Sequence, residues 1–198
     1  MRKTVMYVGL DVHKDSITIA VADEGRNGSV RVYGKIRNDL GQIDTVMRKL
    51  ISKDGEPRCV YEAGPCGYPI YRYLTSKGID CKVVAPALIP RKTGDRIKND
   101  RRDATNLAVL HRSGDLTSVY VPDETDEALR DLVRTRKDIT VALRKVKQQI
   151  NAFVLRHGLS YPGKTKWSKA HVNWLTALRM PHSAQQIALT EYLDAMEN

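Results

Sequence analysis

The amino-acid sequence predicts an α/β domain, built on a mixed sheet with flanking helices, followed by one long helix. Three strand-like segments follow one another across short turns between residues 4 and 36. Strand-like and helix-like segments then alternate to about residue 121, which is typical of helices packed on a mixed sheet. Residues 123–157 contain neither glycine nor proline, and this indicates a single uninterrupted helix.

The three leading strands are expected at residues 4–12, 16–23 and 29–36. The first, TVMYVGLDV, is an apolar run rich in β-branched residues, as in a buried strand. The second and third, SITIAVAD and SVRVYGKI, alternate apolar and polar residues and are separated by the turn sequence GRNG. Consecutive strands joined by such short turns predict an antiparallel meander.

Helices and strands alternate after this meander. Helices are predicted over residues 39–52 and 67–78 and in a stretch that ends near Gly114, with strands at 58–62 and 80–86. Asp39 is the expected N-cap of the first helix, and Gly78 is expected to end the second. This β-β-β-α-β-α-β-α order is that of the ribonuclease H-like fold. The alternative, a generic doubly wound α/β domain, would not begin with a three-stranded meander.

Apolar residues of the long helical segment recur with heptad spacing. They stand at Leu129, Leu132, Ile139, Leu143, Val146, Ile150 and Phe153. Arg136 occupies an a-type position and is the one polar interruption. So narrow a seam favours a coiled coil over a helix packed on its own domain, for which a wider apolar stripe is expected. The sequence therefore predicts a homo-oligomer, a dimer or a higher assembly, formed through residues 123–157.

The chain divides into three predicted regions. Residues 1–121 form the ribonuclease H-like domain, residues 122–158 the coiled-coil helix, and residues 159–198 a further helical region. This last region opens with the loop SYPGKTKW and continues into two helical segments, at about 169–178 and 183–196. It offers little core of its own and is therefore expected to be the beginning of a further domain.

Composition and charge predict a protein that binds a polyanion. The 198 residues carry a net charge of +10, with a pI near 9.6, and the basic residues are clustered. A generically basic soluble protein is the alternative. No apolar run is long enough to span a bilayer, so no membrane partner is expected. The three cysteines lack the spacing of a zinc site or a disulfide framework and fit a reducing cytoplasm.

Two groups of basic residues are candidates for contacts with nucleic-acid phosphates. In the predicted domain they are Lys14, Arg91, Lys92, Arg96, Lys98, Arg101 and Arg102, and on the long helix they are Arg134, Lys137, Arg144 and Lys145. Such contacts position a backbone and do not read its sequence. For Lys14, an exposed turn is the simpler interpretation.

Four carboxylates stand where strands end and a helix begins. Asp11 lies near the end of the first strand and Glu62 ends the fourth, while Asp100 and Asp103 share one face of the first turn of a helix. In a ribonuclease H-like sheet the first and fourth strands are neighbours, so the four side chains are expected to line one cleft. Each also has a local interpretation, as a turn residue or a helix-dipole partner; only their joint placement favours a site.

A cluster of carboxylates without a cation would repel itself. Hard divalent metals prefer oxygen ligands, so Mg²⁺ or Mn²⁺ is the expected cofactor, as two ions held by Asp11, Glu62, Asp100 and Asp103. Paired ions of this kind support phosphodiester chemistry. We therefore predict that the four acids hold metals and that the surrounding arginines and lysines hold phosphates.

Three blocks of the sequence resemble the signature blocks of the DEDD-type transposases of bacterial insertion sequences, a family that includes the pilin-gene invertases. They are YVGLDVHKDSITIAVAD, YEAGPCGYPIYRYL and VVAPALIPRKTGDRIKNDRRDATNLA, and VPDETDEALRDLVRTRKDI resembles the segment that follows them. The resemblance implies a RuvC-like catalytic domain whose acidic tetrad falls on Asp11, Glu62, Asp100 and Asp103.

The same resemblance implies an activity and partners. Family members cut and exchange DNA strands guided by a structured bridge RNA, so DNA and such an RNA are expected partners, in the bacterial cytoplasm at the nucleoid. The family continues into a second domain with a catalytic serine. No serine near the end of this chain has the matching context, so that serine is expected to lie outside it.

Two other functions compete with a metal-dependent strand-transfer enzyme. The same fold could serve only to bind nucleic acid and to dimerise, with no chemistry in this part of the protein. A sugar-kinase-like fold also begins with a strand that carries glycine and aspartate. The kinase hypothesis is weaker, because the sequence shows no Gly-rich phosphate loop in the expected places and its basic excess suits nucleic acid.

Overall fold

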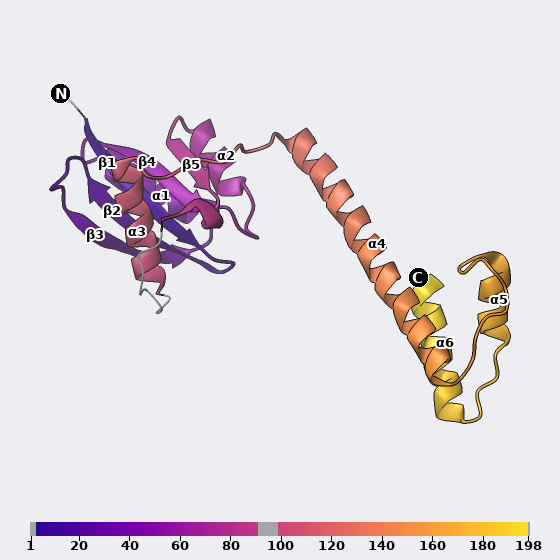
Figure 1. Ribbon diagram of the computed structural model, residues 1–198. Coiled ribbons are helices and arrows are strands. Elements are labelled where there is room, and N and C mark those ends of the chain that lie inside the picture. The colour runs from indigo at the N-terminus through magenta and orange to yellow at the C-terminus, as the bar shows by residue number, and fades with distance from the viewer. Residues whose placement is uncertain (1–2, 91–98, 198) are drawn as a thin grey trace. The chain divides into compact units, whose positions relative to one another are not determined.

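The computed structural model describes residues 3–90 and 99–197. The chain divides after Val121 into two compact units. The first unit contains β1 (Thr4–Val12), β2 (Ser16–Asp23), β3 (Val30–Arg37), α1 (Leu40–Ile51), β4 (Gly55–Glu62), α2 (Pro69–Ser76), β5 (Asp80–Val84) and α3 (Asp100–Ser113). The second contains α4 (Glu124–Arg156), α5 (Lys169–Ala177) and α6 (Ser183–Glu197) (Figure 1).

One mixed sheet forms the centre of the first unit. Its strand order is β3-β2-β1-β4-β5. The pairs β1–β2 and β2–β3 are antiparallel, as expected of a meander, while β1–β4 and β4–β5 are parallel, as expected of strands joined through helices. This arrangement confirms the predicted ribonuclease H-like fold.

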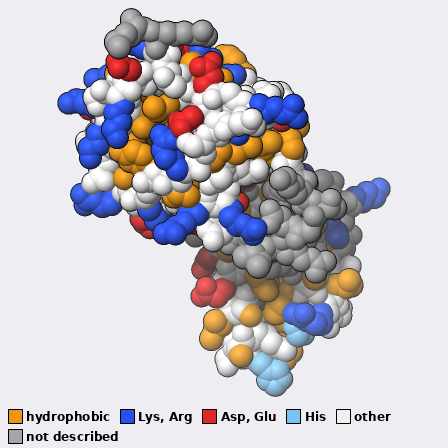
Figure 2. Space-filling model, turned by 90° about the vertical axis from the view of Figure 1, so that its left-hand side faces the viewer, with side chains coloured by type: hydrophobic (Ala, Val, Ile, Leu, Met, Phe, Trp, Pro, Cys, Tyr) orange, Lys and Arg blue, Asp and Glu red, His pale blue; other side chains and the backbone are white. Residues whose placement is uncertain are grey.

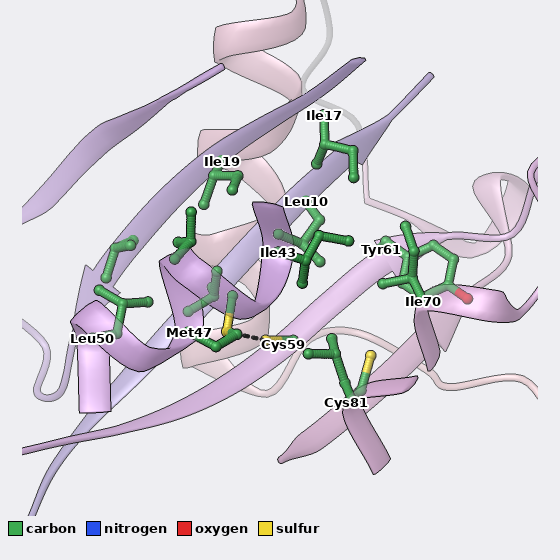
Figure 3. Packing of buried hydrophobic residues seen from close by; sticks show 14 of the residues in the cluster. Leu10, Ile17, Ile19, Ile43, Met47, Leu50, Cys59, Tyr61, Ile70 and Cys81 are labelled. Carbon is green, nitrogen blue, oxygen red and sulfur yellow. Dashed lines mark hydrogen bonds between the residues drawn. The ribbon is translucent and has the colours of Figure 1, made fainter. Parts of the chain in front are cut away.

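Apolar packing covers one face of the sheet. Side chains of β1, β2 and β4 meet α1 there, with Ile43 and Met47 fully buried between them (Figure 3). The predicted N-cap of α1 is also present, since Asp39 accepts a hydrogen bond from the backbone N–H of Gln42 at 3.0 Å. The Cys59 thiol lies in this core, 3.7 Å from the Met47 sulfur. It is fully buried, as expected of a cysteine that packs as a small apolar residue.

Helix α3 packs on the opposite face. Leu107 of the helix meets Val60 of β4 and Val84 of β5, and small residues make the contact with β2. Ala20 and Ala22 of β2 meet Ala104 and Ala108 of α3, and all four are fully buried. Gly9 of β1 lies beneath the same helix, where a β-carbon would stand 2.2 Å from the carbonyl oxygen of Ala104. The helix backbone therefore rests almost directly on the central strand (Figure 1).

Among the strands, β4 departs furthest from its predicted bounds. It begins at Gly55 and not at Arg58. The added residues, Gly-Glu-Pro, resemble a turn in sequence. They are drawn into the sheet by parallel pairing with β1, which begins at the pair Thr4 and Gly55. Tertiary pairing here overrides local propensity.

The second unit contains the long helix that the sequence predicts, and α4 runs for 33 residues. Its C-terminal part packs on the short helices that follow, around Ile150, Phe153, Leu175 of α5 and Leu189 of α6. The described residues after 158 therefore share a core with α4, and that they begin a further domain stays a prediction. No helix in the described parts of the chain is long and apolar enough to cross a membrane.

The predicted heptad seam of α4 is covered along only part of its length. Ile150 and Phe153 are buried against the chain's own short helices, so a second copy is not needed there. The earlier seam positions remain open within the chain, with exposed fractions of 57% for Leu129, 67% for Leu132 and 63% for Ile139. Any helix that covers the seam must cover this first half.

Candidate metal and nucleic-acid site

Strand β1 carries Asp11 to one edge of the sheet and is followed at once by His13. The side chain of Asp11 is 14% exposed, and its Oδ2 lies 3.1 Å from His13 Nε2. Two backbone contacts hold His13 in place, because its N–H donates to Ser16 O at 2.8 Å and its carbonyl accepts from Asn38 Nδ2 at 2.9 Å. These bonds hold the backbone of His13, from which its imidazole reaches the Asp11 carboxylate.

Helix α3 carries Asp100 to the same edge. Asn99 is the N-cap, with its side-chain oxygen accepting from Arg101 N at 3.0 Å, so the helix begins at Asp100. Oδ1 of Asp100 lies 3.6 Å from His13 Nε2, and Oδ2 accepts a hydrogen bond from Lys35 Nζ of β3 at 3.0 Å. Residues from β1, β3 and α3 therefore meet at one point.

Asp11, His13 and Asp100 each offer a ligand atom to a metal ion, and these atoms all lie within 4.8 Å of one another. Carboxylate oxygens suit Mg²⁺ or Mn²⁺, whereas an imidazole nitrogen suits transition metals better than Mg²⁺. Two of these residues were predicted from the sequence, and His13 was not predicted as a ligand. Its signal is the spacing Asp-x-His at a strand end, which places both side chains on one face.

The electrostatics of the group also fit a cation. Partial burial raises the pKa of Asp11, and the nearby charges of Asp100 and Asp103 raise it further, although His13 opposes them. The pKa of Asp100 is lowered, mainly by its hydrogen bond from Lys35. A bound divalent ion would favour the ionised form of Asp11, so these residues fit the metal that the sequence predicts.

The other two predicted acids take different positions. Asp103 lies one turn into α3, half-buried and near enough to influence the pKa of Asp11. Glu62 ends β4, and the pairing of Leu10 with Tyr61 places it at the same end of the sheet as Asp11. Among the described residues, neither belongs to the close group formed with His13. Their roles as ligands stay predictions.

The predicted nucleic-acid contacts divide between the two units. Arg91, Lys92, Arg96 and Lys98 lie outside the described residues. Lys14, Arg101 and Arg102 of the first unit are exposed, as are Arg134, Lys137, Arg144 and Lys145 of α4. Blue Lys and Arg side chains outnumber red Asp and Glu on the face of the molecule in Figure 2. Their contact with nucleic acid stays a prediction.

These features define the class of the first unit. It is a ribonuclease H-like domain with an acidic site at the end of its first strand. Residues 8–158 match the DEDD-type IS110 family, described as transposase, and the chain belongs to this family. The family assignment agrees with the resemblance of the three sequence blocks.

The chain is similar to two named transposases. It is 48% identical to the putative transposase y4qE of Sinorhizobium fredii and 38% identical to the transposase for insertion sequence element IS1533 of Leptospira borgpetersenii, in each case over 96% of this chain. The matches cover 49% and 55% of those proteins, so the chain spans about half their length. The large terminase nuclease of thermophilic phage G20c matches 57% of this chain and 56% of its own, at 18% identity and a TM-score of 0.33.

Proposed function

We propose that this chain is the metal-dependent catalytic half of a DNA transposase that cuts and exchanges DNA strands. The observation that carries the proposal is the meeting of Asp11, His13 and Asp100 on a ribonuclease H-like sheet, in a chain of the IS110 transposase family. The chain spans about half the length of its relatives. We therefore propose that strand exchange needs more than this half of the protein.

Each side chain has a proposed part in that reaction. Asp11, Glu62, Asp100 and Asp103 are the ligands of Mg²⁺ or Mn²⁺, as two ions. When bound, such ions supply Lewis-acid stabilisation of charge on phosphate oxygens. His13 keeps the Asp11 carboxylate oriented through its 3.1 Å contact, and the exposed basic residues hold DNA phosphates beside the acids.

A structured guide RNA is the second proposed partner. The proposed place of action is the bacterial cytoplasm, at the nucleoid. Support comes from the family, and from a net charge of +10, which suits two polyanions. The rival function is a nucleic-acid-binding and dimerisation module without chemistry. The exposed basic side chains and the open apolar stripe of α4 would serve such a module as well.

Metal removal tests the function directly. We expect the chain to nick branched DNA with Mg²⁺ or Mn²⁺ and to stop when EDTA is added, because the acids cannot replace the cation. A gel assay of end-labelled junctions measures nicking, and isothermal titration measures metal binding. Metal-independent DNA binding with no nicking under any divalent ion, even when the second half of a relative is supplied in trans, would favour the rival module.

We further propose that the first half of α4 pairs with the same helix of a second copy. A water-exposed apolar stripe at Leu129, Leu132 and Ile139 is costly unless it is covered. A second copy presents an identical stripe, and two-fold pairing is the commonest assembly of identical chains. Arg136 within the seam would fix the register if an acid of the partner reached it.

The double change Leu132→Asp with Ile139→Asp is expected to weaken self-association by about a hundredfold or more, because it buries two unpaired charges in the seam. Sedimentation equilibrium measures the effect. Val141→Asp is the control, since Val141 is 52% exposed and lies off the seam, and it should associate like the wild type. A wild-type chain that is monomeric at tens of micromolar would contradict the coiled coil.

A further inference from the structure

A cavity of about 390 Å³ lies beside the acidic group, on the face of the sheet that carries α3. Thr18 of β2 and Lys35 of β3 line it from the sheet, and Asn99, Asp100 and Arg101 line it from the start of the helix. Asp100 thus belongs both to the cavity wall and to the group with Asp11 and His13. Whatever fills the cavity lies next to the proposed metals.

Thr18 is the unusual residue of this cavity. Its side chain is 1% exposed, and its hydroxyl has no hydrogen-bond partner among the described residues. A buried hydroxyl without a partner destabilises a fold, because it has lost its hydrogen bonds to water and gained none in return. Valine has nearly the same shape and is likewise enriched in strands, so strand propensity does not explain a threonine here. A ligand that accepts a hydrogen bond in the cavity does explain it.

The charges around the cavity select an anion. Lys35 Nζ has three N–H groups, of which one is directed at Asp100, and Arg101 adds a guanidinium. The cavity also faces the N-terminus of a 14-residue helix, where anions are favoured. Asp100 is the opposing charge, and Lys35 already compensates it at 3.0 Å.

We propose that this cavity holds the DNA backbone phosphate next to the phosphate that is cut, with its sugar. Lys35 and Arg101 bind the phosphate oxygens and the Thr18 hydroxyl donates to one of them. The volume supports this, since a single water occupies about 30 Å³ and a phosphate with its sugar needs several times that. The inference rests on the proposed function, because the neighbouring phosphate is defined by the metal-dependent cut.

The test uses the whole chain, a branched DNA, and Ca²⁺ as a divalent ion that is expected not to support cutting. Lys35→Met should weaken DNA binding about tenfold and reduce the slope of log affinity against log salt by roughly one unit, as for one lost phosphate contact. Thr18→Val should weaken binding about threefold with an unchanged slope, because it removes a neutral donor. Thr18→Val should also keep or raise the stability of the fold, which separates this role from a structural one.

A chemical probe identifies the phosphate itself. Neutral methylphosphonates placed singly along the strand should weaken wild-type binding at one position next to the cut, and Lys35→Met should show no further loss there. Lys49→Met, on α1 across the sheet, is the charge-matched control and should retain that position's effect.

Three results would overturn the inference. In the first, Lys35→Met and a methylphosphonate weaken DNA binding additively at every position. In the second, both cavity variants bind DNA as the wild type does. In the third, the variants bind RNA more weakly but DNA normally. If the wild type binds no DNA at all, the proposed function fails together with the subsite. If both variants bind DNA normally, the subsite is contradicted and the proposed function is not.

Discussion

A chain carrying Asp11→Asn is expected to lose divalent-metal binding and to cut DNA about a thousandfold more slowly than the wild type, or worse. Asparagine keeps the shape of the side chain and its contact with His13, but it removes the charge that holds the cation. Loss of the several kcal/mol that metals supply to phosphoryl transition states corresponds to a rate loss of about this size.

The same change should not destabilise the fold. Burial and the charges of Asp100 and Asp103 raise the pKa of Asp11 in the folded chain above 3.8. The native state then holds the proton more tightly than the unfolded state, so the contribution of Asp11 to stability is greatest below pH 3.8 and is lost as the pH rises through the folded pKa. At neutral pH, Asn removes a charge that the fold disfavours, so the unfolding free energy should stay level or rise.

Thermal unfolding with and without Mn²⁺ separates the two effects. Mn²⁺ should raise the midpoint of the wild type and leave that of Asp11→Asn unchanged. Glu56→Gln makes an equivalent change on β4 at the opposite end of the sheet, where Glu56 pairs with Arg58, and it should behave as the wild type does. If Asp11→Asn still binds Mn²⁺ and still cuts DNA, Asp11 is not a metal ligand.

Sequence reasoning singled out Asp11 and Asp100 because each stands near an element boundary that pattern alone reveals. Asp11 lies near the end of an apolar run, and Asp100 follows an N-cap asparagine. It did not find Lys35, whose place beside Asp100 depends on the register of β3 against β2, in which Lys35 faces Thr18. Contacts between residues 65 positions apart follow from sheet pairing, and local patterns carry no information on them.

The long helix shows the same limit in another form. Heptad spacing predicted the helix and its apolar seam, and α4 ends within two residues of the expected bounds. Spacing alone does not say what covers the seam. Ile150 and Phe153 are covered by helices that come later in the same chain, whereas Leu132 and Ile139 remain open to a partner.

Gly9 connects the fold to the site, and its role is visible only in the structure. A glycine inside a buried strand indicates that something approaches closely, but not what approaches. Here the neighbour is the backbone of α3, with the carbonyl oxygen of Ala104 at 2.2 Å and the amide nitrogen of Ala108 at 2.6 Å from a β-carbon built on Gly9. Asp100 and Asp103 lie on that helix, so its distance from β1 sets their distance from Asp11.

Gly9→Ala is expected to lower the unfolding free energy of the first unit by about 3 kcal/mol or more, at the upper end for overpacking a core. Strand β1 is paired on both sides and cannot move aside, so the helix must. Hydrogen-exchange mass spectrometry of peptides from β1 and α3 measures the loss. Fluorescence from Trp167 and Trp174, both in the second unit, should be unchanged.

Two companion variants make the test specific. Gly64→Ala places its methyl group 3.9 Å from the nearest atom, an ordinary contact, and should leave stability unchanged. Ala108→Gly should not rescue Gly9→Ala, because the clashing atoms belong to the helix backbone. The fraction of Gly9→Ala that remains folded should bind Mn²⁺ more weakly, since a displaced α3 carries Asp100 away from Asp11. Wild-type stability and metal binding in Gly9→Ala would mean that close packing of α3 does not position the acids.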